Sequence, residues 1–461
     1  MTRSYLALGA CVLLTGSAFA QSDFQPRQGE PLSGLTANEL ALFFEGKLAF
    51  NTPLEVADGV GPIFNDRSCG NCHSTPAIGG WSTRAVTRFG KMAGGGMPFD
   101  PLDHLGGTLQ QDQAISAPCQ EVIPPEADII GKRLTPIVFG AGLLEGIDDV
   151  DILNNQANQP TGFVGFSHMV QPVEDPMGPL RSSKFNWKGG TATVLNFSAG
   201  AGLNELGLTS VFFPMENAPN GDLAQLAMCD TVSDPEDLPD SSGRTLVDKY
   251  TFFQRYLAAP PQTPRSGMTG EALFNSVGCA VCHTSTAYIT VPAAESALSG
   301  VPVLPYSDFL VHDMGSMGDG FVEGAATETE MMTRALWGLG SRTAMLHDGS
   351  ATGGDFAANS IAAIVAHDGE GLASAVAFQG LSTADQGLVV DFLQSLGRAE
   401  WDYEHDNDVD AFDWFFVFPD LSGPLPSFGP DDPGALSDVD QDGDFDLMDF
   451  SVMQRAFSGN L

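Results

Sequence analysis

Two segments of the sequence repeat the pattern Cys-x-x-Cys-His, at residues 69–73 and 279–283. Two thiols three positions apart can each form a thioether with a haem vinyl group, and the histidine that follows can bind the iron. A Cys-x-x-Cys pair alone also occurs as half of a zinc site or as a redox pair. Because a histidine directly follows the second cysteine in both segments, we favour two covalently bound c-type haems. The residues that would hold them are Cys69, Cys72, His73, Cys279, Cys282 and His283.

Residues 1–20 have the layout of a secretory signal. Arg3 gives a positive start, an apolar run follows, and residues 18–20 (Ala-Phe-Ala) form a small-residue cleavage site. The apolar run is too short to span a bilayer, which takes about 20 residues, and no later run is long enough. We therefore expect an exported protein in the periplasm, outside the cell or at the cell surface. These are the compartments in which disulfides persist.

The cysteine count supports an oxidising compartment. Of 7 cysteines, one lies in the signal and four in the haem motifs, which leaves Cys119 and Cys229. An even remainder in an exported protein favours a disulfide between them. Two separate buried thiols are the alternative.

The charge balance excludes some partners. The chain has 58 acidic and 20 basic residues, for a net charge of −38. Such a charge argues against nucleic acid and against anionic membrane surfaces as partners, and it would attract a basic electron-donor protein. A solvated acidic surface suited to salty surroundings is the simpler explanation of the same charge.

The segments around the first haem motif must position it. Thr36 and Glu39 form a capping-box pattern that opens a helix ahead of the motif. Residues 100–260 mix short strand-like runs, such as 191–197, with turns rich in proline and glycine. We expect them to form an elaborated insertion around the first haem.

The second haem motif lies in a simpler unit. A helix is expected at residues 246–257, and a proline-rich break at 258–265 predicts a domain boundary after it. Beyond the second motif, Thr383 and Gln386 form a capping-box pattern that opens a closing amphipathic helix, which ends at Gly397. A haem motif after one helix, followed by a closing helix, is typical of a c-type cytochrome domain.

The sequence turns strongly acidic after Gly397, where two acidic segments repeat 36 residues apart. Oxygen ligands at loop positions 1, 3, 5 and 12, with Gly or Asn at position 6, are what calcium needs. Position 12 is Asp rather than the Glu of an EF-hand, so the pattern resembles dockerin repeats, with an apolar helix after each loop at 412–418 and 447–457. An unfolded acidic tail is the alternative. The candidate calcium ligands are Asp402, Glu404, Asp406, Asp408, Asp413, Asp438, Asp440, Asp442, Asp444 and Asp449.

Together these features predict a mainly α protein. It would contain two cytochrome c-like haem domains, the first with a large irregular or β insertion, and a small C-terminal α module of dockerin-like calcium-binding repeats. The expected divisions are a signal at 1–20, haem domains at 21–262 and 263–398, and the repeats at 399–461.

Further motifs resemble those of the di-haem oxidoreductase family, whose members are related to bacterial di-haem cytochrome c peroxidases. The resemblance covers roughly residues 30–398 and implies reduction of hydrogen peroxide, or of a related oxidant, with electrons from a small redox protein. The motifs are residues 61–65 (GPIFN), 185–188 (FNWK), 204–209 (NELGLT), 306–308 (YSD), 312–315 (HDMG), 336–340 (LWGLG) and 347–349 (HDG).

The resemblance also suggests ligands for the sixth position of each iron. His367 lies in a segment similar to the one that supplies a methionine ligand in the peroxidases, so we expect it to bind the second iron. A solvated histidine at a helix end is the alternative. For the first iron His312 is the first choice, although it could instead lie between the haems, bonded to a propionate. The remaining candidates are Met314, His104 and Met97.

Glu205 is the candidate catalytic residue. Peroxide cleavage needs a base that moves a proton from the inner to the outer oxygen so that water can leave. The pair Glu205-Leu206 resembles the turn that supplies this carboxylate in the peroxidases, whereas the alternative is a surface Glu at the start of a helix. Trp81 and Trp337 could lie between the haems, but core packing is the commoner role. His347 is expected in a tight loop over the second haem.

The leading interpretation is an exported di-haem peroxidase. One rival is an electron-transfer cytochrome in which both irons have two protein ligands. Another is an oxidoreductase acting on a thiol or an organic substrate. A third gives the C-terminal repeats the main role, with a cohesin-like or cell-envelope partner.

Overall fold

The computed structural model describes residues 25–92, 99–263, 268–421, 423, 424, 429, 431, 437–439 and 442–457. The expected signal at 1–20, the candidate iron ligand Met97 and the candidate calcium ligand Asp440 lie outside the described residues. Helices account for 36% of the structure and strands for 12%, so helix is more abundant than strand, in the direction predicted.

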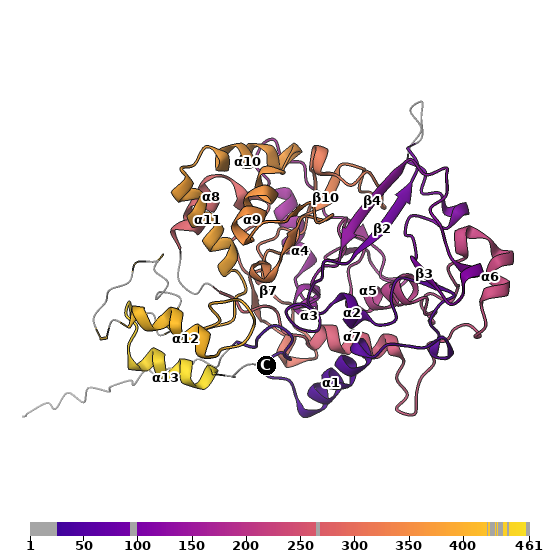
Figure 1. Ribbon diagram of the computed structural model, residues 1–461, viewed down its shortest axis with the longest axis horizontal. Coiled ribbons are helices and arrows are strands. Elements are labelled where there is room, and N and C mark those ends of the chain that lie inside the picture. The colour runs from indigo at the N-terminus through magenta and orange to yellow at the C-terminus, as the bar shows by residue number, and fades with distance from the viewer. Residues whose placement is uncertain are drawn as a thin grey trace, which may run out of the picture.

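The helices alternate with irregular segments along the whole chain (Figure 1). A π-helical turn at Gly202–Leu206 directly follows α5. The α-helices are α1 (Ala37–Asn51), α2 (Cys69–Cys72), α3 (Ala141–Glu145), α4 (Asp149–Ala157), α5 (Val194–Ala201), α6 (Leu223–Cys229), α7 (Leu246–Tyr256), α8 (Thr269–Ser276), α9 (Phe356–Val365), α10 (Leu372–Gln379), α11 (Thr383–Ser395), α12 (Ala411–Val417) and α13 (Leu447–Ala456).

The strands of the described part pair into two-stranded antiparallel sheets, in the order β1-β3, β2-β4, β5-β6, β7-β8, β9-β10 and β11-β12. The longest pair is β2-β4, in register from Ala85 opposite Leu134 to Gly90 opposite Ile129. The strands are β1 (Ile63–Phe64), β2 (Ala85–Gly90), β3 (Gln113–Ala114), β4 (Ile129–Leu134), β5 (Met169–Val170), β6 (Arg181–Ser182), β7 (Tyr288–Ile289), β8 (Pro302–Val303), β9 (Val311–Asp313), β10 (Glu330–Met332), β11 (Ala344–Met345) and β12 (Ala351–Thr352).

The first core is built on α1 and α7, which lie side by side at the bottom of Figure 1. The predicted capping box opens α1, since the backbone N–H of Glu39 donates to the Thr36 hydroxyl and the Glu39 carboxylate accepts from the Thr36 N–H. Gly46 allows the two helices to approach closely, because a Cβ there would lie 2.3 Å from the Lys249 carbonyl oxygen. The rings of Phe50 and Phe253 then pack with centroids 4.8 Å apart.

A second core joins α8 to α11. The Phe274 ring lies 5.4 Å from the Phe392 ring, centroid to centroid. The prediction that Thr383 caps α11 is wrong by one residue, because the Ser382 hydroxyl accepts from the Asp385 N–H at 3.1 Å and Thr383 is already helical. The first core also includes Trp337, together with residues of 288–310, from beyond the boundary expected at 262–263.

The strand-like run 191–197 is mostly helical, which corrects the prediction. Thr193 caps α5, since its hydroxyl accepts from the Asn196 N–H at 3.2 Å. Ser198 then accepts a hydrogen bond from Gln254 of α7 at 2.7 Å. Capping and packing on α7 therefore outweigh the strand preference of the β-branched residues.

The described C-terminal residues form a small apolar core of their own. Trp401 and Phe445 are buried in it, and the Trp414 and Phe450 rings pack with centroids 5.1 Å apart. Figure 1 shows α12 and α13 in yellow, next to each other and far from β2 and β4. The first acidic loop is tied to the N-terminal segment, because the Asn407 carboxamide exchanges two hydrogen bonds with the backbone of Gln28, at 2.9 and 3.2 Å.

The length and apolar composition of a helix decide whether it can cross a membrane. Within the described residues, no single helix has both the length and the apolar composition needed to cross a bilayer. Helix α9 and residues 369–379 reach that length and apolar composition only as a pair, and a bend of 107° separates them.

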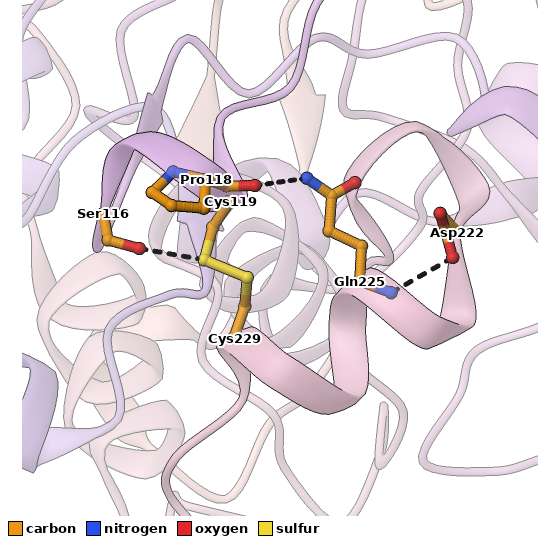
Figure 2. The surroundings of a disulfide bond; sticks show 6 residues. All are labelled: Ser116, Pro118, Cys119, Asp222, Gln225 and Cys229. Atoms are coloured by element: carbon orange, nitrogen blue, oxygen red, sulfur yellow. Dashed lines mark hydrogen bonds between the residues drawn. A yellow bond between two sulfur atoms is a disulfide. The ribbon is translucent and has the colours of Figure 1, made fainter.

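The two remaining cysteines meet, as predicted. Figure 2 shows Cys119, at the end of a 3₁₀ turn, in a disulfide with Cys229, the last residue of α6. Both are buried, and the Ser116 hydroxyl lies 3.0 Å from the Cys119 sulfur. Gln225 of α6 also donates to the Pro118 carbonyl oxygen, so the disulfide and a hydrogen bond fasten α6 to the same turn.

Removing this disulfide should destabilise the protein. It closes a separation of 110 residues, and cross-links over long loops typically contribute about 2–4 kcal/mol by restricting the unfolded chain. The paired variant Cys119→Ser with Cys229→Ser should lower the free energy of unfolding by about that amount in a denaturant titration. Unchanged stability of the variant relative to the oxidised wild type would contradict the pairing.

Candidate functional site

The first Cys-x-x-Cys-His segment forms a short helical turn on the wall of a cavity. Ser68 caps α2, with its hydroxyl accepting from the Asn71 N–H at 3.2 Å. Cys69, Cys72 and His73 all line a cavity of about 570 Å³. The turn therefore presents both thiols and the imidazole to one space.

His73 is held in the form that binds iron. Its Nδ1 lies 3.1 Å from the Gly80 carbonyl oxygen, which leaves Nε2 for another bond. Burial lowers the pKa of His73 to about 4, so the imidazole is neutral at physiological pH. Gly80 permits this close approach, because a Cβ there would lie 1.9 Å from the Thr75 carbonyl oxygen.

The second segment repeats this arrangement in a separate cavity of about 250 Å³. Cys279, Cys282 and His283 line it. The Nδ1 of His283 lies 2.9 Å from the Tyr306 carbonyl oxygen, and burial lowers the pKa of His283 to about 4. Because the two Cys-x-x-Cys pairs line different cavities, they do not combine into one four-thiol zinc site.

Both cavities suit haem. The four motif cysteines are free of disulfides, as thioether formation requires. Arg334 and Arg342 line the second cavity, and neither has a carboxylate partner among the described residues. Burial lowers the pKa of each guanidinium to about 10. Buried cations need an anion, and haem propionates would supply it.

His367 lines the second cavity. It is far from the second motif in the sequence, but it faces the same space as His283. The residue follows the end of α9, and its Nδ1 lies 2.8 Å from the Ala363 carbonyl oxygen. Burial lowers the pKa of His367, so its imidazole is also neutral with Nε2 available. His347 lines this cavity as well.

His312 does not lie at the first cavity, so the expectation that it completes the first iron's ligands is wrong. It lines the second cavity, with Nδ1 2.9 Å from Glu370 and Nε2 2.9 Å from Asp308. Burial alone would lower the pKa of His312, but the hydrogen bond to the Asp308 carboxylate raises it. An imidazole that is bonded to a carboxylate through each nitrogen has no free lone pair for iron.

Two other candidates for the first iron, both among the described residues, are also absent from its cavity. Met314 lines the second cavity, and His104 is exposed and lines neither. Among the described residues that line the first cavity, His73 is the only histidine and there is no methionine.

Glu205 does line the first cavity, together with Cys69 and His73. It lies in the π-helical turn after α5, and such turns are frequent at functional sites. Its Oε2 accepts a hydrogen bond from the Asn65 side chain at 2.7 Å. Burial raises the pKa of Glu205, and the Asn65 hydrogen bond and the charge of Arg88 offset only part of that rise.

Three arginines line the first cavity, and each is paired with a carboxylate. Arg84 pairs with Asp66, Arg88 pairs with Glu323, and Arg133 pairs with both Glu323 and Asp319. The buried Lys188 also bonds Asp319 at 3.0 Å. This network fixes the β2-β4 ribbon against residues 319–323 and keeps the cationic wall of the cavity in place.

Trp187 is a residue that the sequence reasoning missed. It lines both cavities, as Pro136 does, whereas Trp337 lines only the second and Trp81 lines neither. Its indole N–H donates to the Leu134 carbonyl oxygen at 3.1 Å. The motif at 185–188 identified this tryptophan only as part of a resemblance, because its place between the cavities depends on tertiary structure.

The acidic repeats gather carboxylates at the start of α12 and of α13. Oxygens of Glu404, Asp410 and Asp413 lie within 4.8 Å of one another, and so do those of Asp444, Asp446 and Asp449. Asp410 and Asp446 are additions to the predicted ligands, and both cap their helices.

Four other predicted calcium ligands, Asp402, Asp406, Asp438 and Asp442, accept hydrogen bonds from the backbone of their own loops. Asp402 accepts from the N–H groups of Asp406 and Asn407, at 3.1 and 3.0 Å. Asp438 accepts in the same way from Asp442 and Gly443. Asp406 and Asp442 in turn accept from the N–H groups of Asp408 and Asp444.

Comparison with known proteins identifies a family and includes a solved structure among its matches. No curated protein matches the sequence. A hydrazine synthase of Kuenenia stuttgartiensis has 12% identity and a TM-score of 0.30, over 86% of this chain and 99% of that one. The family described as "Di-haem oxidoreductase, putative peroxidase" matches residues 117–396, which include the second haem motif and Glu205 but not the first motif. With more than half of its length matched, the chain belongs to the di-haem oxidoreductase family.

Proposed function

We propose that this protein is an exported di-haem c-type peroxidase that reduces hydrogen peroxide at the first haem. The observation that carries the proposal is the difference between the two cavities. The second offers a neutral imidazole, His367, in addition to His283. Among the described residues that line the first cavity, His73 is the only histidine, and the buried carboxylate of Glu205 stands in place of a second imidazole. A catalytic haem needs a sixth position that can open, whereas an electron-transfer haem usually has two protein ligands.

The haems, when bound, supply the iron and the redox chemistry that two-electron reduction of peroxide to water requires. In this assignment His73 and His283 are the proximal ligands. Their Nδ1 contacts with the carbonyl oxygens of Gly80 and Tyr306 fix each ring and direct Nε2 to the metal.

Glu205 moves the proton. Cleavage of the O–O bond is easier when the proton on the inner oxygen passes to the outer oxygen, which then leaves as water. Burial raises the pKa of the Glu205 carboxylate, which makes it a stronger base for accepting that proton. The charges of Arg88 and Arg84 oppose the rise in the pKa of Glu205 and favour its ionised form.

A second candidate function is oxidation of a thiol or an organic substrate at the same haem. The observation that favours it is the size of the first cavity, about 570 Å³ against about 250 Å³ for the second. Since each would hold the same cofactor, the first has more room for a further molecule. A pure electron-transfer role is disfavoured, because the described lining of the first cavity offers no second imidazole or thioether.

Electrons would enter at the second haem from a small redox protein, and the net charge of −38 favours a basic donor. The C-terminal loops would bind calcium through their gathered carboxylates, since hard cations prefer such oxygens. A dockerin-like module of this kind would attach the enzyme to a cohesin-like or cell-envelope partner.

The Glu205→Gln variant should lose about 10²–10⁴-fold in peroxide turnover, the range that general acid–base catalysis contributes. Glutamine preserves the shape and the contact with Asn65 but cannot accept the proton. The control is Glu121→Gln, which neutralises another buried carboxylate that does not line the cavity. Steady-state turnover of both haem-loaded variants is the measurement, and full activity of Glu205→Gln would refute the role.

The His367→Ala variant should convert the second haem from low-spin to high-spin, because it loses its sixth ligand. Optical and EPR spectra of the oxidised protein would show the change. His347→Ala is the matched control, since His347 lines the same cavity. A spectrum that changes in the His347 variant and stays the same in the His367 variant would show that His347, and not His367, is the sixth ligand.

Calcium should stabilise the C-terminal module. At a concentration 100-fold above the dissociation constant, binding adds about 2.7 kcal/mol to the stability of a folded unit. Added calcium should therefore raise the unfolding temperature of chelator-treated protein, and should not do so after Asp413→Asn with Asp449→Asn. Asp103→Asn, an exposed residue outside the repeats, is the control. An equal calcium response in all three proteins would place the bound ion elsewhere.

A further inference from the structure

Asn65 lies where the first haem motif and the catalytic turn come together. It directly follows β1 and precedes Cys69 by four positions, and it is only 4% exposed. Its main-chain N–H and that of Asp66 both donate to the Glu205 carbonyl oxygen, at 2.8 and 3.1 Å. The segment that leads into the haem motif is thereby bonded to the backbone of the π-helical turn.

The side chain of Asn65 makes a second connection, and its orientation is fixed. Its Oδ1 accepts from the Asp112 N–H at 3.0 Å. Because that oxygen faces a donor, the amide nitrogen is the atom that faces Glu205, and it donates to Oε2 at 2.7 Å. Gln113 and Arg84 donate to the Asn65 carbonyl oxygen, so the residue is also held from β3 and from the residue that precedes β2.

We infer that Asn65 is a positioning residue that holds one oxygen of Glu205 and leaves the other to exchange the proton with substrate. The inference rests on the proposed function, and it explains what fixes the orientation of the Glu205 carboxylate. No other side-chain hydrogen bond to Glu205 exists within the described structure. Without Asn65 the carboxylate would be free to rotate in a cavity of about 570 Å³.

The charged groups that face Glu205 determine the direction of the effect. Arg88 and Arg84 favour its ionised form, and Asp112 opposes it. The sulfurs of Cys69 and Cys72 are also near, but thioethers do not ionise. The Asn65 hydrogen bond favours the carboxylate, so removing it should raise the pKa of Glu205 further. The activity that needs the ionised base should then be lost at a higher pH than in the wild type.

The test compares Asn65→Ala, the isosteric Asn65→Asp and Glu205→Gln in the haem-loaded protein. Both Asn65 variants should lower peroxide turnover, roughly 10- to 100-fold for a misplaced catalytic group, and should shift the acid limb of the pH profile upward. Infrared difference spectra against Glu205→Gln should show the protonated carboxyl band of Glu205 persisting to higher pH. The control is Asn155→Ala, which removes hydrogen bonds to Tyr288 and Asp308 away from the first cavity. It should shift neither the acid limb of the pH profile nor the carboxyl band of Glu205.

A double-mutant cycle separates this inference from the proposed function. If Asn65 acts through Glu205, adding Asn65→Ala to Glu205→Gln should cost almost nothing further. Full turnover by Glu205→Gln would reject the proposed function itself. Loss of turnover in Glu205→Gln, with an unchanged pH profile and carboxyl band in both Asn65 variants, would reject only the role of Asn65.

Discussion

A haem held by two thioethers and a histidine requires both thiols and the imidazole to line one cavity, with the imidazole neutral. The rest of the structure depends on how the chain meets this requirement twice. A short turn capped by Ser68 does so at the first motif, and a turn after Gly278, at φ +93°, does so at the second. In each case a main-chain carbonyl bonds Nδ1, and burial removes the charge from the ring. The main-chain contacts of His73 with Gly80 and of His283 with Tyr306 are therefore needed, together with the motif, to orient each imidazole.

The two sites then differ because different segments close the cavities. A helix end brings His367 to the second, whereas a π-helical turn brings Glu205 to the first. Glu205 and its partner Asn65 are 140 residues apart in sequence. The long insertion between the motifs thus supplies both the carboxylate and Trp187, which lines both cavities. The asymmetry that our account assigns to catalysis arises from this insertion.

Features that depend on a few neighbouring residues could be predicted from the sequence. The Thr36 capping box, the helices near 246–257 and 447–457, and the pairing of two leftover cysteines belong to this group. Features that depend on distant contacts could not. The run 191–197 has strand-forming residues but folds mostly as a helix against α7. His312 bonds the nearby Asp308, but its second carboxylate partner, Glu370, is 58 residues away in the sequence. Asp410 joins a carboxylate cluster and caps α12, and the predicted ligands omit it because the loop pattern requires oxygens there only at positions 1, 3, 5 and 12.

The central claim is that the second iron has two imidazole ligands and the first has one, with a position left for substrate. EPR and magnetic circular dichroism of the fully haem-loaded protein, oxidised and after one-electron reduction, test it directly. We predict one low-spin iron with two histidines in the oxidised state, and a different iron that binds added cyanide in the half-reduced state. Two irons that each keep two protein ligands in both states, with no cyanide complex, would contradict the account.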